Sequence, residues 1–318
     1  MVEAYLTGIF PRSEKLIAAT RALDRGRASQ EEVKNVLRRD AEEVVQLQLD
    51  AGMAFASDGL LNWQDIFRPL VEAWDGLSLG GLRRWFDNNT FFRQPVVSSS
   101  LEPRPIPDEY LQVGLLPGDR PWKAVLPGPY TFTDMAENRY YQGPREALLS
   151  LAECLADVSK GLESKGFHQV QFNEPSLVVN PPQEALLEDV KEAYEIIRRS
   201  VDMQISLHTF FGSARPLLPH LLDFPVDILG LDLYEEGLDG LGQYDFVKVL
   251  ACGCVDSRNS LLERPEEISK IATQALEALN PKDIILCPNA DLEFLPRGVA
   301  EDKVRALGLA AETDWEVV

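Results

Sequence analysis

The chain has 318 residues, of which 45% are hydrophobic and 26% are charged, a balance typical of a globular protein with a sizeable core. Its 31 basic and 51 acidic residues give a formal charge of −20, which repels phosphate backbones and argues against nucleic acid as a partner. No apolar run long enough to span a membrane occurs, and the first residues lack the features of a signal peptide, so we expect a cytoplasmic protein without a membrane partner.

Short apolar runs alternate with long amphipathic patterns along the chain, as in βα units around a parallel sheet. A first strand is expected to end near residues 7–10, and a helix is expected over 11–25. A second helix is expected over 29–52, because Ser29 and Glu32 have the spacing of a capping box. Further strands are predicted at 53–57, 123–126, 169–172, 204–207, 228–231, 247–251 and 284–287. Further helices are predicted at 144–165, 182–201, 214–222, 265–279 and 298–311.

Eight βα repeats predict a closed (β/α)₈ TIM barrel that occupies residues 1–318 as a single domain. The sequence over 62–120 departs from the repeat and is interpreted as a long insertion after the second strand. Its segment 98–107, which contains three serines and three prolines, is expected to be an exposed extended loop.

The insertion also carries a segment, residues 80–89, that combines arginines, aromatic residues and amides. Loops on a rigid barrel often determine specificity, so Trp85, Asp87 and Asn88 are candidates for substrate binding. The alternative is a surface cluster of arginine, aspartate and tryptophan side chains.

Polar residues follow most of the predicted strands. In TIM barrels the βα loops converge at the carboxyl ends of the strands, and the chemistry is found there. Carboxylates around such a mouth can hold an amine, and an arginine or lysine can bind a carboxylate, so the set suits an amino acid. The alternative for each acidic or amide residue is that it caps the following helix. The residues at or near the strand ends are Arg12, Lys15, Asp58, Asn173, Glu174, His208, Asp232, Asp256, Arg258, Asn289 and Asp291.

His208 follows an apolar alternation and is expected at the barrel mouth. Cys252, Cys254 and Cys287 also lie near predicted strand ends, and thiolates together with imidazole are zinc ligands. Cysteine is also a common small core residue, and the Cys-x-Cys spacing is not a strong structural-zinc pattern. We therefore expect reduced thiols, no bound metal and no other cofactor. A glycine-rich phosphate loop, a Ser-His-Asp order and a His-Glu-x-x-His motif are missing from the sequence, which removes several enzyme classes.

Five segments, taken together and in order, are similar to motifs of one enzyme family. They are Thr7-Gly8-Ile9-Phe10-Pro11-Arg12, Trp85-Phe86-Asp87-Asn88-Asn89, Leu126-Pro127-Gly128-Pro129-Tyr130-Thr131, Gln171-Phe172-Asn173-Glu174-Pro175-Ser176-Leu177 and Val255-Asp256-Ser257-Arg258-Asn259. The set resembles the cobalamin-independent methionine synthases, which have two homologous barrels. The resemblance covers nearly the whole chain and is closer to the amino-terminal barrel, which holds no zinc, than to the catalytic barrel.

The resemblance implies a reaction in which a methyl group moves from a folate to homocysteine, whose thiol is activated by zinc in the catalytic barrel. It places the family's His-x-Cys zinc motif at His208-Thr209-Phe210, its glutamate ligand at about Asp232, and its second cysteine within the segment 288–292. Both thiolates are therefore missing, and one imidazole with one carboxylate cannot complete a tetrahedral zinc site. The family's homocysteine-binding aspartate corresponds to Asn173, and its folate-facing aromatic residue corresponds to Met135.

Two functions follow from the resemblance. The first is a methyltransferase that moves a methyl group from a folate or another donor to a homocysteine-type thiol, with altered activation chemistry that uses a partner, a corrinoid protein or a displaced metal. The second is a non-catalytic barrel that binds the folate tail or docks on a separate zinc-bearing catalytic barrel. A third family, uroporphyrinogen decarboxylase, shares the barrel, but the arginines near the mouth are too few for a porphyrin. The catalytic candidates are His208, Asp232, Asn173 and Glu174, and the substrate-binding candidates are Arg12, Lys15, Asp58, Trp85, Asp87, Asn88, Asp256 and Arg258.

Overall fold

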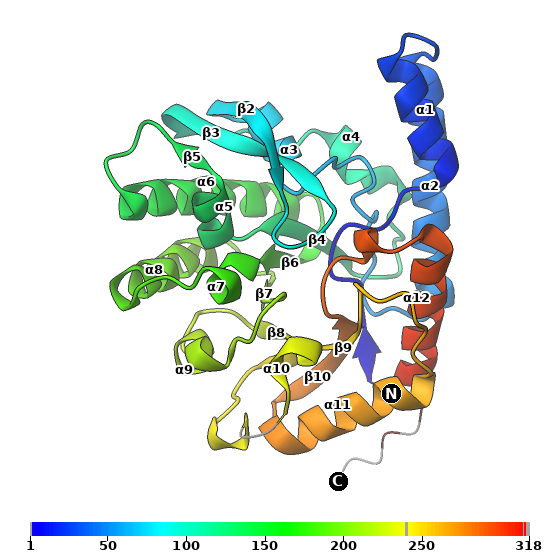
Figure 1. The fold of residues 1–318 in the computed structure, drawn as a ribbon, viewed down its shortest axis with the longest axis vertical. Coiled ribbons are helices and arrows are strands. Elements are labelled where there is room, and N and C mark those ends of the chain that lie inside the picture. Colours follow the sequence, from blue (N-terminus) through cyan, green and yellow to red (C-terminus); the bar gives the residue numbers. More distant parts are fainter. Residues whose placement is uncertain (1, 239–240, 314, 316–318) are drawn as a thin grey trace.

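The computed structural model describes residues 2–238, 241–313 and 315 of the chain. Seven parallel strands form one curled sheet in the order β1-β10-β9-β8-β7-β6-β4 (Figure 1). These strands are β1 (Glu3–Ala4), β4 (Trp122–Pro127), β6 (Phe167–Asn173), β7 (Gln204–His208), β8 (Ile228–Asp232), β9 (Val249–Val255) and β10 (Asp283–Pro288).

The segment 53–57, predicted as the second strand, lies between the two edges of this sheet. Ala54 donates its N–H to the carbonyl of Ala4 over 2.8 Å, and Ala56 forms a parallel bridge with Trp122. The segment therefore joins β1 to β4 by hydrogen bonds, although it makes only one bridge of its own. The predicted TIM-barrel fold is confirmed.

The bounds of two strands were predicted wrongly. The first strand ends at Ala4. Tyr5 still donates its N–H to the carbonyl of Leu286 in β10 over 3.0 Å, but Phe10, expected at the strand end, donates its N–H to the carbonyl of Gly59 over 2.9 Å. The strand expected over 247–251 is β9, which starts at Val249, because the N–H of Val247 is turned back to the carbonyl of Asp245, and runs on to Val255.

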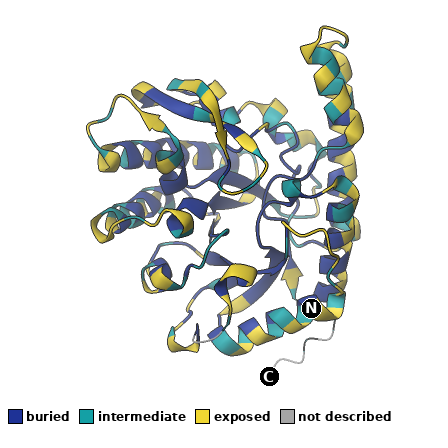
Figure 2. Ribbon diagram, viewed as in Figure 1, coloured by how far each residue is buried: buried dark blue, intermediate teal, exposed yellow. Residues whose placement is uncertain are grey.

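Helices surround the sheet, and their inner faces are buried while their outer faces are exposed (Figure 2). The capping box of the second helix is confirmed: Glu32 donates its N–H to Ser29 Oγ over 3.2 Å, and Ser29 donates its N–H to the Glu32 carboxylate over 2.6 Å. The helices outside the insertion are α1 (Glu14–Asp24), α2 (Gln30–Asp50), α5 (Pro129–Met135), α6 (Pro144–Ser164), α7 (Pro175–Val179), α8 (Glu184–Ser200), α9 (Leu218–Leu222), α10 (Leu233–Glu236), α11 (Pro265–Leu279) and α12 (Arg297–Glu312). Short 3-10 turns are η2 (Arg215–Leu217), η3 (Leu241–Gln243) and η4 (Leu292–Phe294).

The sequence over 62–120 contains its own secondary structure: α3 (Arg68–Ala73), β2 (Asp75–Arg84), β3 (Phe91–Glu102), α4 (Asp108–Leu111) and η1 (Val113–Leu115). Strands β2 and β3 form an antiparallel hairpin, and β3 pairs in parallel with β5 (Glu137–Asn138), which precedes α6. The exposed loop expected over 98–107 is therefore wrong for 98–102, which belongs to β3 because its backbone pairs with β2.

Aromatic side chains fix this hairpin to the barrel. The ring of Phe67 lies 5.1 Å from that of Phe132 in α5, and the ring of Trp74 stacks on Phe132 at 6.1 Å. Trp85 and Phe92 pack against Phe67 from the hairpin itself. The base of the hairpin is thus held by buried apolar contacts beside the carboxyl end of β4. Within the described part of the chain, no helix is long and apolar enough to cross a membrane.

Candidate functional site

The carboxyl ends of the strands bring several predicted site residues to one level of the barrel. In the parallel register, Asn173 at the end of β6 pairs with His208 at the end of β7, and His208 pairs with Gly230 in β8. Asp232 ends β8 one pleat further toward the mouth and pairs with Gly253. The side chains of Asn173, His208 and Asp232 are buried, so the interior below the mouth is polar.

A chain of buried hydrogen bonds runs from the interior of the barrel to its mouth. Lys123 Nζ donates to Gln171 Oε1 over 2.6 Å, and Gln171 Nε2 donates to Asn173 Oδ1 over 2.6 Å. Asn173 Nδ2 then donates to Asp291 Oδ1 over 3.3 Å. Burial lowers the pKa of Lys123 well below its usual range, and burial raises the pKa of Asp291 to about 7. The chain therefore connects a buried amine with a buried carboxyl group at the mouth.

His208 points into the barrel. Its Nε2 shares a hydrogen bond of 2.9 Å with the hydroxyl of Tyr5, and its ring lies directly over Gly230, where a Cβ would overlap with it. Burial, with a contribution from nearby Lys123, lowers the pKa of His208 well below its usual range, so the ring is neutral. One of its two nitrogens is thus already engaged within the barrel.

Asp232 caps the short helix that follows its strand, as the capping alternative expects. Its Oδ1 accepts from the N–H of Tyr234 over 3.2 Å and from Asn289 Nδ2 over 3.0 Å, and its Oδ2 accepts from the N–H of Phe211 over 3.3 Å. Burial raises the pKa of Asp232, and the bond from Asn289 opposes that shift. The carboxylate therefore ties together the loops after β7, β8 and β10.

Glu174 is also held by the backbone of a neighbouring loop. Its carboxylate accepts from the N–H groups of Tyr130 and Thr131, over 3.0 and 2.7 Å, and from the hydroxyl of Tyr194 over 3.2 Å. Burial raises the pKa of Glu174 to about 7 despite these bonds. The side chain faces the first turn of α5, and Gly128 leaves room for it because any Cβ there would overlap with the carboxylate.

Arg12 lines a cavity of about 190 Å³ between the barrel and the insertion. Trp85, Thr90, Asp291 and Glu293 contribute to the same walls. Within residues 2–238, 241–313 and 315, neither the guanidinium of Arg12 nor the carboxyl group of Glu293 makes a hydrogen bond or an ion pair. Burial raises the pKa of Glu293 to about 8, and the charge of nearby Asp291 adds to the shift, whereas the charge of nearby Arg12 opposes it. The cavity therefore holds charged groups of both signs, and Arg12 lies close enough to Glu293 for the two charges to attract each other.

The tip of the hairpin covers another part of the mouth. The ring of Phe86 lies 5.7 Å from that of Phe211, in the loop after β7, and Phe211 in turn lies 5.7 Å from Phe294. Phe86 and Phe211 both have a positive φ, 48° and 72°, which is uncommon and costly for an aromatic residue. Backbone strain of this kind is concentrated at functional sites and mobile lids.

Three further predicted residues, Asp256, Arg258 and Asp58, are not among the residues that line the cavity. Asp256 accepts from the N–H of Arg258 over 2.9 Å, and Arg258 forms an ion pair with Glu235 and lies 5.2 Å from the ring of Phe211. Both are thus on the side of the mouth covered by the hairpin tip. Asp58 is buried, and its Oδ1 accepts from the N–H of Leu60 over 3.0 Å.

Three substrate-binding candidates are placed where they have little contact with the mouth. The side chain of Asp87 is fully exposed at the hairpin tip, where solvent surrounds it. Lys15 is exposed on α1. Asn88 donates its side-chain N–H to the carbonyl of Trp85 over 3.3 Å and so stabilises the tip itself. Sequence reasoning missed Glu293, because it lies in η4, beyond the strand end at which the rule for barrel mouths stops.

Three of the four cysteines lie on the neighbouring strands β9 and β10, where Cys254 Sγ is 3.9 Å from the carbonyl oxygen of Cys287. Cys252 lies inside β9, which corrects its expected placement at a strand end, whereas Cys254 is next to the last residue of β9. Cys287 packs with Tyr5 in a separate apolar cluster. Burial raises the pKa of Cys252 and of Cys287, so both are thiols. Among the residues that the structure describes, no three histidine, cysteine, aspartate or glutamate side chains are arranged to hold a metal ion.

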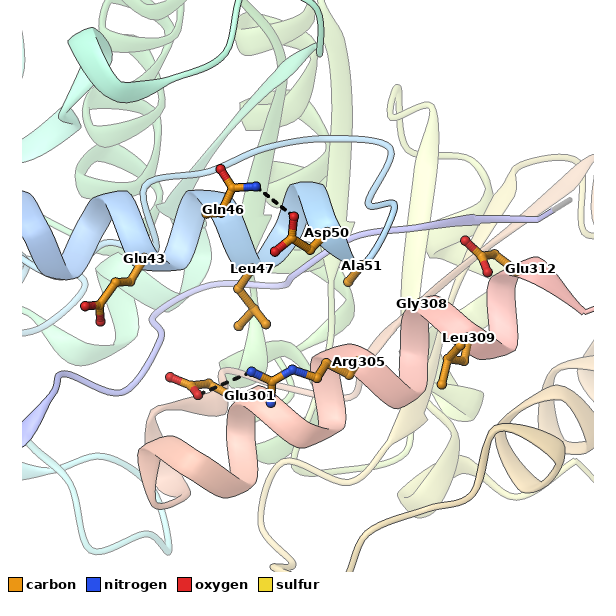
Figure 3. A pocket seen from close by; sticks show the side chains of 10 residues that line it. All are labelled: Glu43, Gln46, Leu47, Asp50, Ala51, Glu301, Arg305, Gly308, Leu309 and Glu312. Carbon is orange, nitrogen blue, oxygen red and sulfur yellow. Dashed lines mark hydrogen bonds and ion pairs between the residues drawn. The ribbon is translucent and has the colours of Figure 1, made fainter.

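A larger hollow, of about 610 Å³, lies outside the barrel between α2 and α12 (Figure 3). Its walls include Glu43, Asp50, Glu301 and Glu312, and Arg305 pairs with Glu301 over 3.6 Å. It is far from the strand ends in the fold, and its one arginine is already paired. We therefore place the candidate site at the mouth and not in this hollow.

Comparisons with known proteins identify the family and the fold. The model of the amino-terminal domain of cobalamin-independent synthases matches residues 79–279. The chain is 26% identical over 306 residues to a methionine synthase of Saccharolobus solfataricus, with 93% of this chain and 90% of that protein covered.

Two solved structures share the fold. A B12-independent methionine synthase from Shewanella sp. W3-18-1, in complex with selenomethionine, superposes with a TM-score of 0.80 at 19% identity, covering 98% of this chain and 97% of that one. A methyltransferase from Methanosarcina mazei superposes with a TM-score of 0.62 at 14% identity, covering 96% and 93%. The chain belongs to the cobalamin-independent methionine synthase family, with its match to the amino-terminal domain of those enzymes.

Proposed function

We propose that the chain is a methyltransferase-type barrel that binds a homocysteine-like thiol or thioether at its mouth and has no zinc site of its own. Arg12, Asn173 and Asp291 are the binding residues nearest to the cavity, with Trp85 as its aromatic wall. His208, Asp232 and Glu174 position the surrounding loops. Residues 1–318 act as one domain in this proposal, with 62–120 as an insertion that helps to form the site.

The proposal rests on the residues that stand where the family's zinc ligands would meet. The nitrogen Nε2 of His208 is engaged with Tyr5, Asp232 is used as a helix cap, and Phe210 and Ala290 have no donor atoms. Structural and catalytic zinc needs at least three protein ligands in tetrahedral arrangement. These residues do not fit zinc, so we derive no step of the reaction through a metal.

The first test measures methionine formation by the purified chain from methyl-tetrahydrofolate and homocysteine, with and without excess zinc. We expect little product, because without an ion to hold the sulfur beside the methyl group much of the orientation advantage, roughly 7–11 kcal/mol in well-aligned systems, is lost. Zinc content is measured by atomic emission in parallel, with less than stoichiometric metal expected. Efficient turnover by the chain alone, or stoichiometric tightly bound zinc, would contradict the proposal.

The second half of that test adds a partner. We expect activity to appear or rise when a zinc-bearing catalytic barrel or a corrinoid protein from the same organism is added, because the chain binds substrate but does not activate it. The control adds the same partner to a variant in which Arg305 of the outer hollow is changed to glutamine. Equal activity of the partner with and without the chain would argue against the partnership.

A second candidate function is a non-catalytic barrel that binds the folate tail. The observation in its favour is a groove of about 510 Å³ beside the cavity, between α1 and the hairpin. Arg12, Arg21, Arg68 and Arg93 line it together with Asp24 and Asp65, and Arg68 forms an ion pair with Asp65 at 3.5 Å, although the whole chain carries a charge of −20. Guanidinium groups gathered on an acidic protein favour an anionic ligand such as a run of glutamate carboxylates.

This candidate is tested by comparing folates with one and with three glutamates. A non-catalytic tail-binding barrel binds the triglutamate more tightly, loses that preference when Arg21 and Arg93 become glutamine, and transfers no methyl group with any partner. Equal binding of the two folates would refute it.

A further inference from the structure

Strand β2 of the hairpin forms one edge of its sheet. In the order β2-β3-β5 it pairs with β3 on one side, and no strand in the described part of the chain pairs with its other side. None of its 10 residues is buried, and Leu79 and Leu82 are 40% and 63% exposed. An edge strand presents backbone N–H and C=O groups without partners, so exposed leucines beside them favour pairing with another strand.

The ladder between β2 and β3 shows which backbone groups of β2 face the free edge. In an antiparallel pair, opposite residues either bond to each other or both face away from each other. The carbonyl of Val97 accepts from the N–H of Arg139 over 2.9 Å, on the far side of β3, so Leu77, opposite Val97, faces the free edge. Leu79 follows two residues later and faces the same way. It lies opposite Pro95, which has no N–H to donate to β2.

The same reasoning applies beyond the β-bulge at residues 80–81. The N–H of Arg93 donates to the carboxylate of Asp65 over 3.2 Å, so Arg93 faces away from β2. Leu82, its partner in the ladder, therefore faces the free edge, as does Arg84 two residues later. The backbone groups at the free edge are thus those of Leu77, Leu79, Leu82 and Arg84.

The spacing of these four residues is the same in both directions along the strand. Their partners are every second residue of β3, namely Val97, Pro95, Arg93 and Phe91. The bulge therefore does not interrupt the row. Two antiparallel copies of β2 can pair Leu77 of one copy with Arg84 of the other. Leu79 then pairs with Leu82, so that the exposed leucines of both copies cover each other.

Two glycines lie at the centre of this pairing. Gly80 is needed within the chain, because a Cβ there would lie 2.9 Å from the carbonyl oxygen of Gln94. Gly81 has no such internal reason, since its φ lies outside the left-handed region and a Cβ there would meet no described atom within 4 Å. Glycine inside a strand often marks the close approach of another backbone. At Gly81 that backbone would belong to the second copy.

The beginning of β2 is acidic. Asp75 is its first residue, and Glu102 lies opposite Asp75 in the ladder. Arg104 forms an ion pair with Asp75 and supplies one positive charge against these two carboxylates. The side chain of Asp75 is 56% exposed, so a group from outside the chain can also reach it.

The end of β2 is basic. Arg83 and Arg84 are its last residues. Asp87 lies 3.9 Å from Arg84 but is fully exposed, so it offsets only part of their charge. An antiparallel second copy therefore brings opposite charges together at both ends of the strand, whereas a parallel copy would bring like charges together.

We propose that two copies of the chain form a dimer by antiparallel pairing of their β2 strands, with a two-fold axis at residues 80–81. The two hairpins then belong to one continuous sheet. Each outer end of that sheet is β5, which has only two residues and is too short to extend the pairing, so assembly stops at two copies. One strand pair buries less than the roughly 1,600 Å² of a standard interface, so we expect a weak dimer with a micromolar dissociation constant. The inference does not depend on the proposed function.

Sedimentation equilibrium of the full chain over a hundredfold range of concentration measures the dimer. Hydrogen exchange over the same range locates it. We expect the amides of Leu77, Leu79 and Leu82 to exchange more slowly at high concentration. The amide of Ser78, which already bonds to β3 because it lies opposite Val96, should exchange at the same rate at every concentration.

Three variants test the pairing itself. Leu79→Pro removes an N–H that faces the free edge and takes no bond from the hairpin, so it should weaken the dimer at least tenfold. Arg84→Glu and Asp75→Lys each place like charges together at both ends of the paired strands, and each should weaken the dimer several-fold. An equimolar mixture of these two charge variants should restore it, because both ends of the mixed dimer again carry opposite charges.

Arg305→Glu is the matched control. Its side chain is 55% exposed and that of Arg84 is 52% exposed, so the two substitutions change the same charge at similar exposure. We expect Arg305→Glu to dimerise like the unchanged chain. Each variant is compared only if its thermal unfolding remains cooperative. If Leu79→Pro fails to fold, the charge variants and their mixture still test the assignment.

Four results would overturn the inference. The first is a chain that stays monomeric over the whole range, which would leave the edge of β2 to a strand from another protein. The second is a dimer that Leu79→Pro does not weaken, which would place the contact on another surface. The third is an equal effect of Arg305→Glu and Arg84→Glu, and the fourth is a mixture of the two charge variants that remains as weak as either alone.

Discussion

Replacing Asp291 with asparagine tests how much the buried carboxyl group lowers the stability of the fold and whether its charge is needed for binding. Asparagine keeps the shape of the side chain and an oxygen that accepts from Asn173, but it has no charge. Burial raises the pKa of Asp291 to about 7, from an ordinary value of 3.8. Between these values the folded carboxyl group keeps its proton while the unfolded one loses it, so the unchanged protein becomes less stable as the pH rises through this window.

The size of the effect follows from the width of the window. Each pH unit in which only the unfolded state is ionised costs about 1.36 kcal/mol, so the two units between pH 5 and pH 7 cost roughly 2.5 kcal/mol. The variant has no such dependence at this position. The difference in unfolding free energy, Asp291→Asn minus the unchanged chain, should therefore grow by roughly 2–3 kcal/mol from pH 5 to pH 8. Because Asp291 and Glu293 influence each other's ionisation, this change is assigned to the two carboxyl groups together.

Urea unfolding of both proteins at pH 5, 6, 7 and 8 measures this difference. Asp87→Asn is the matched control, because the Asp87 side chain is fully exposed and loses no solvation on folding. A difference that is constant across the pH range for Asp291→Asn would refute the reasoning, as would an equal trend in the control. A variant that is more stable at pH 8 but binds L-methionine poorly would show that the charge is kept for the ligand and not for the fold.

Three further predictions concern the residues around the mouth. Gly230→Ala should destabilise the chain by about 1–3 kcal/mol, measured by urea unfolding, because the new Cβ would overlap with the ring of His208; no loss of stability would mean that the ring is free to move. Glu174→Ala should cost about 3 kcal/mol in the same measurement, since the N–H groups of Tyr130 and Thr131 lose a buried acceptor, and a cost below 1 kcal/mol would place water there instead. Phe86→Gly should relieve a strained φ of 48° and remove the contact with Phe211. L-methionine should then associate and dissociate faster in stopped-flow measurements, and unchanged rates would show that the hairpin tip does not limit access to the mouth.

The barrel itself could be predicted because its signals are local. Apolar runs of strand length, proline-initiated helices and the Ser29–Glu32 capping box are each encoded within a few residues. The boundaries that failed depend on contacts between distant segments. The first strand stops at Ala4 because the residues after it bond to the loops around Gly59 and Ala290, which no local pattern reveals.

The site was predicted less completely than the fold. The rule that polar residues gather at strand ends selected Arg12, Asn173 and Asp291, which the structure brings to one cavity or its edge. It could not distinguish residues that face the cavity from those used by neighbouring loops, because Glu174 and Asp232 differ from Asp291 only in what surrounds them. Glu293 lies in a 3-10 turn whose direction depends on packing against the insertion, so it had no sequence signal.

The three positions 8, 173 and 291 come from three different loops, and their residue types constrain one another. A carboxylate at 291 requires a residue without Cβ at 8, because the space beside Gly8 is filled by the Asp291 side chain. A second carboxylate at 173 would lie in hydrogen-bond contact with Asp291 in a buried position, where two like charges cannot both be ionised without a large cost. An amide at 173 removes that repulsion and supplies a donor to Asp291. An uncharged residue at 173, where the family has an aspartate, is therefore expected once Asp291 in the loop after β10 carries the charge.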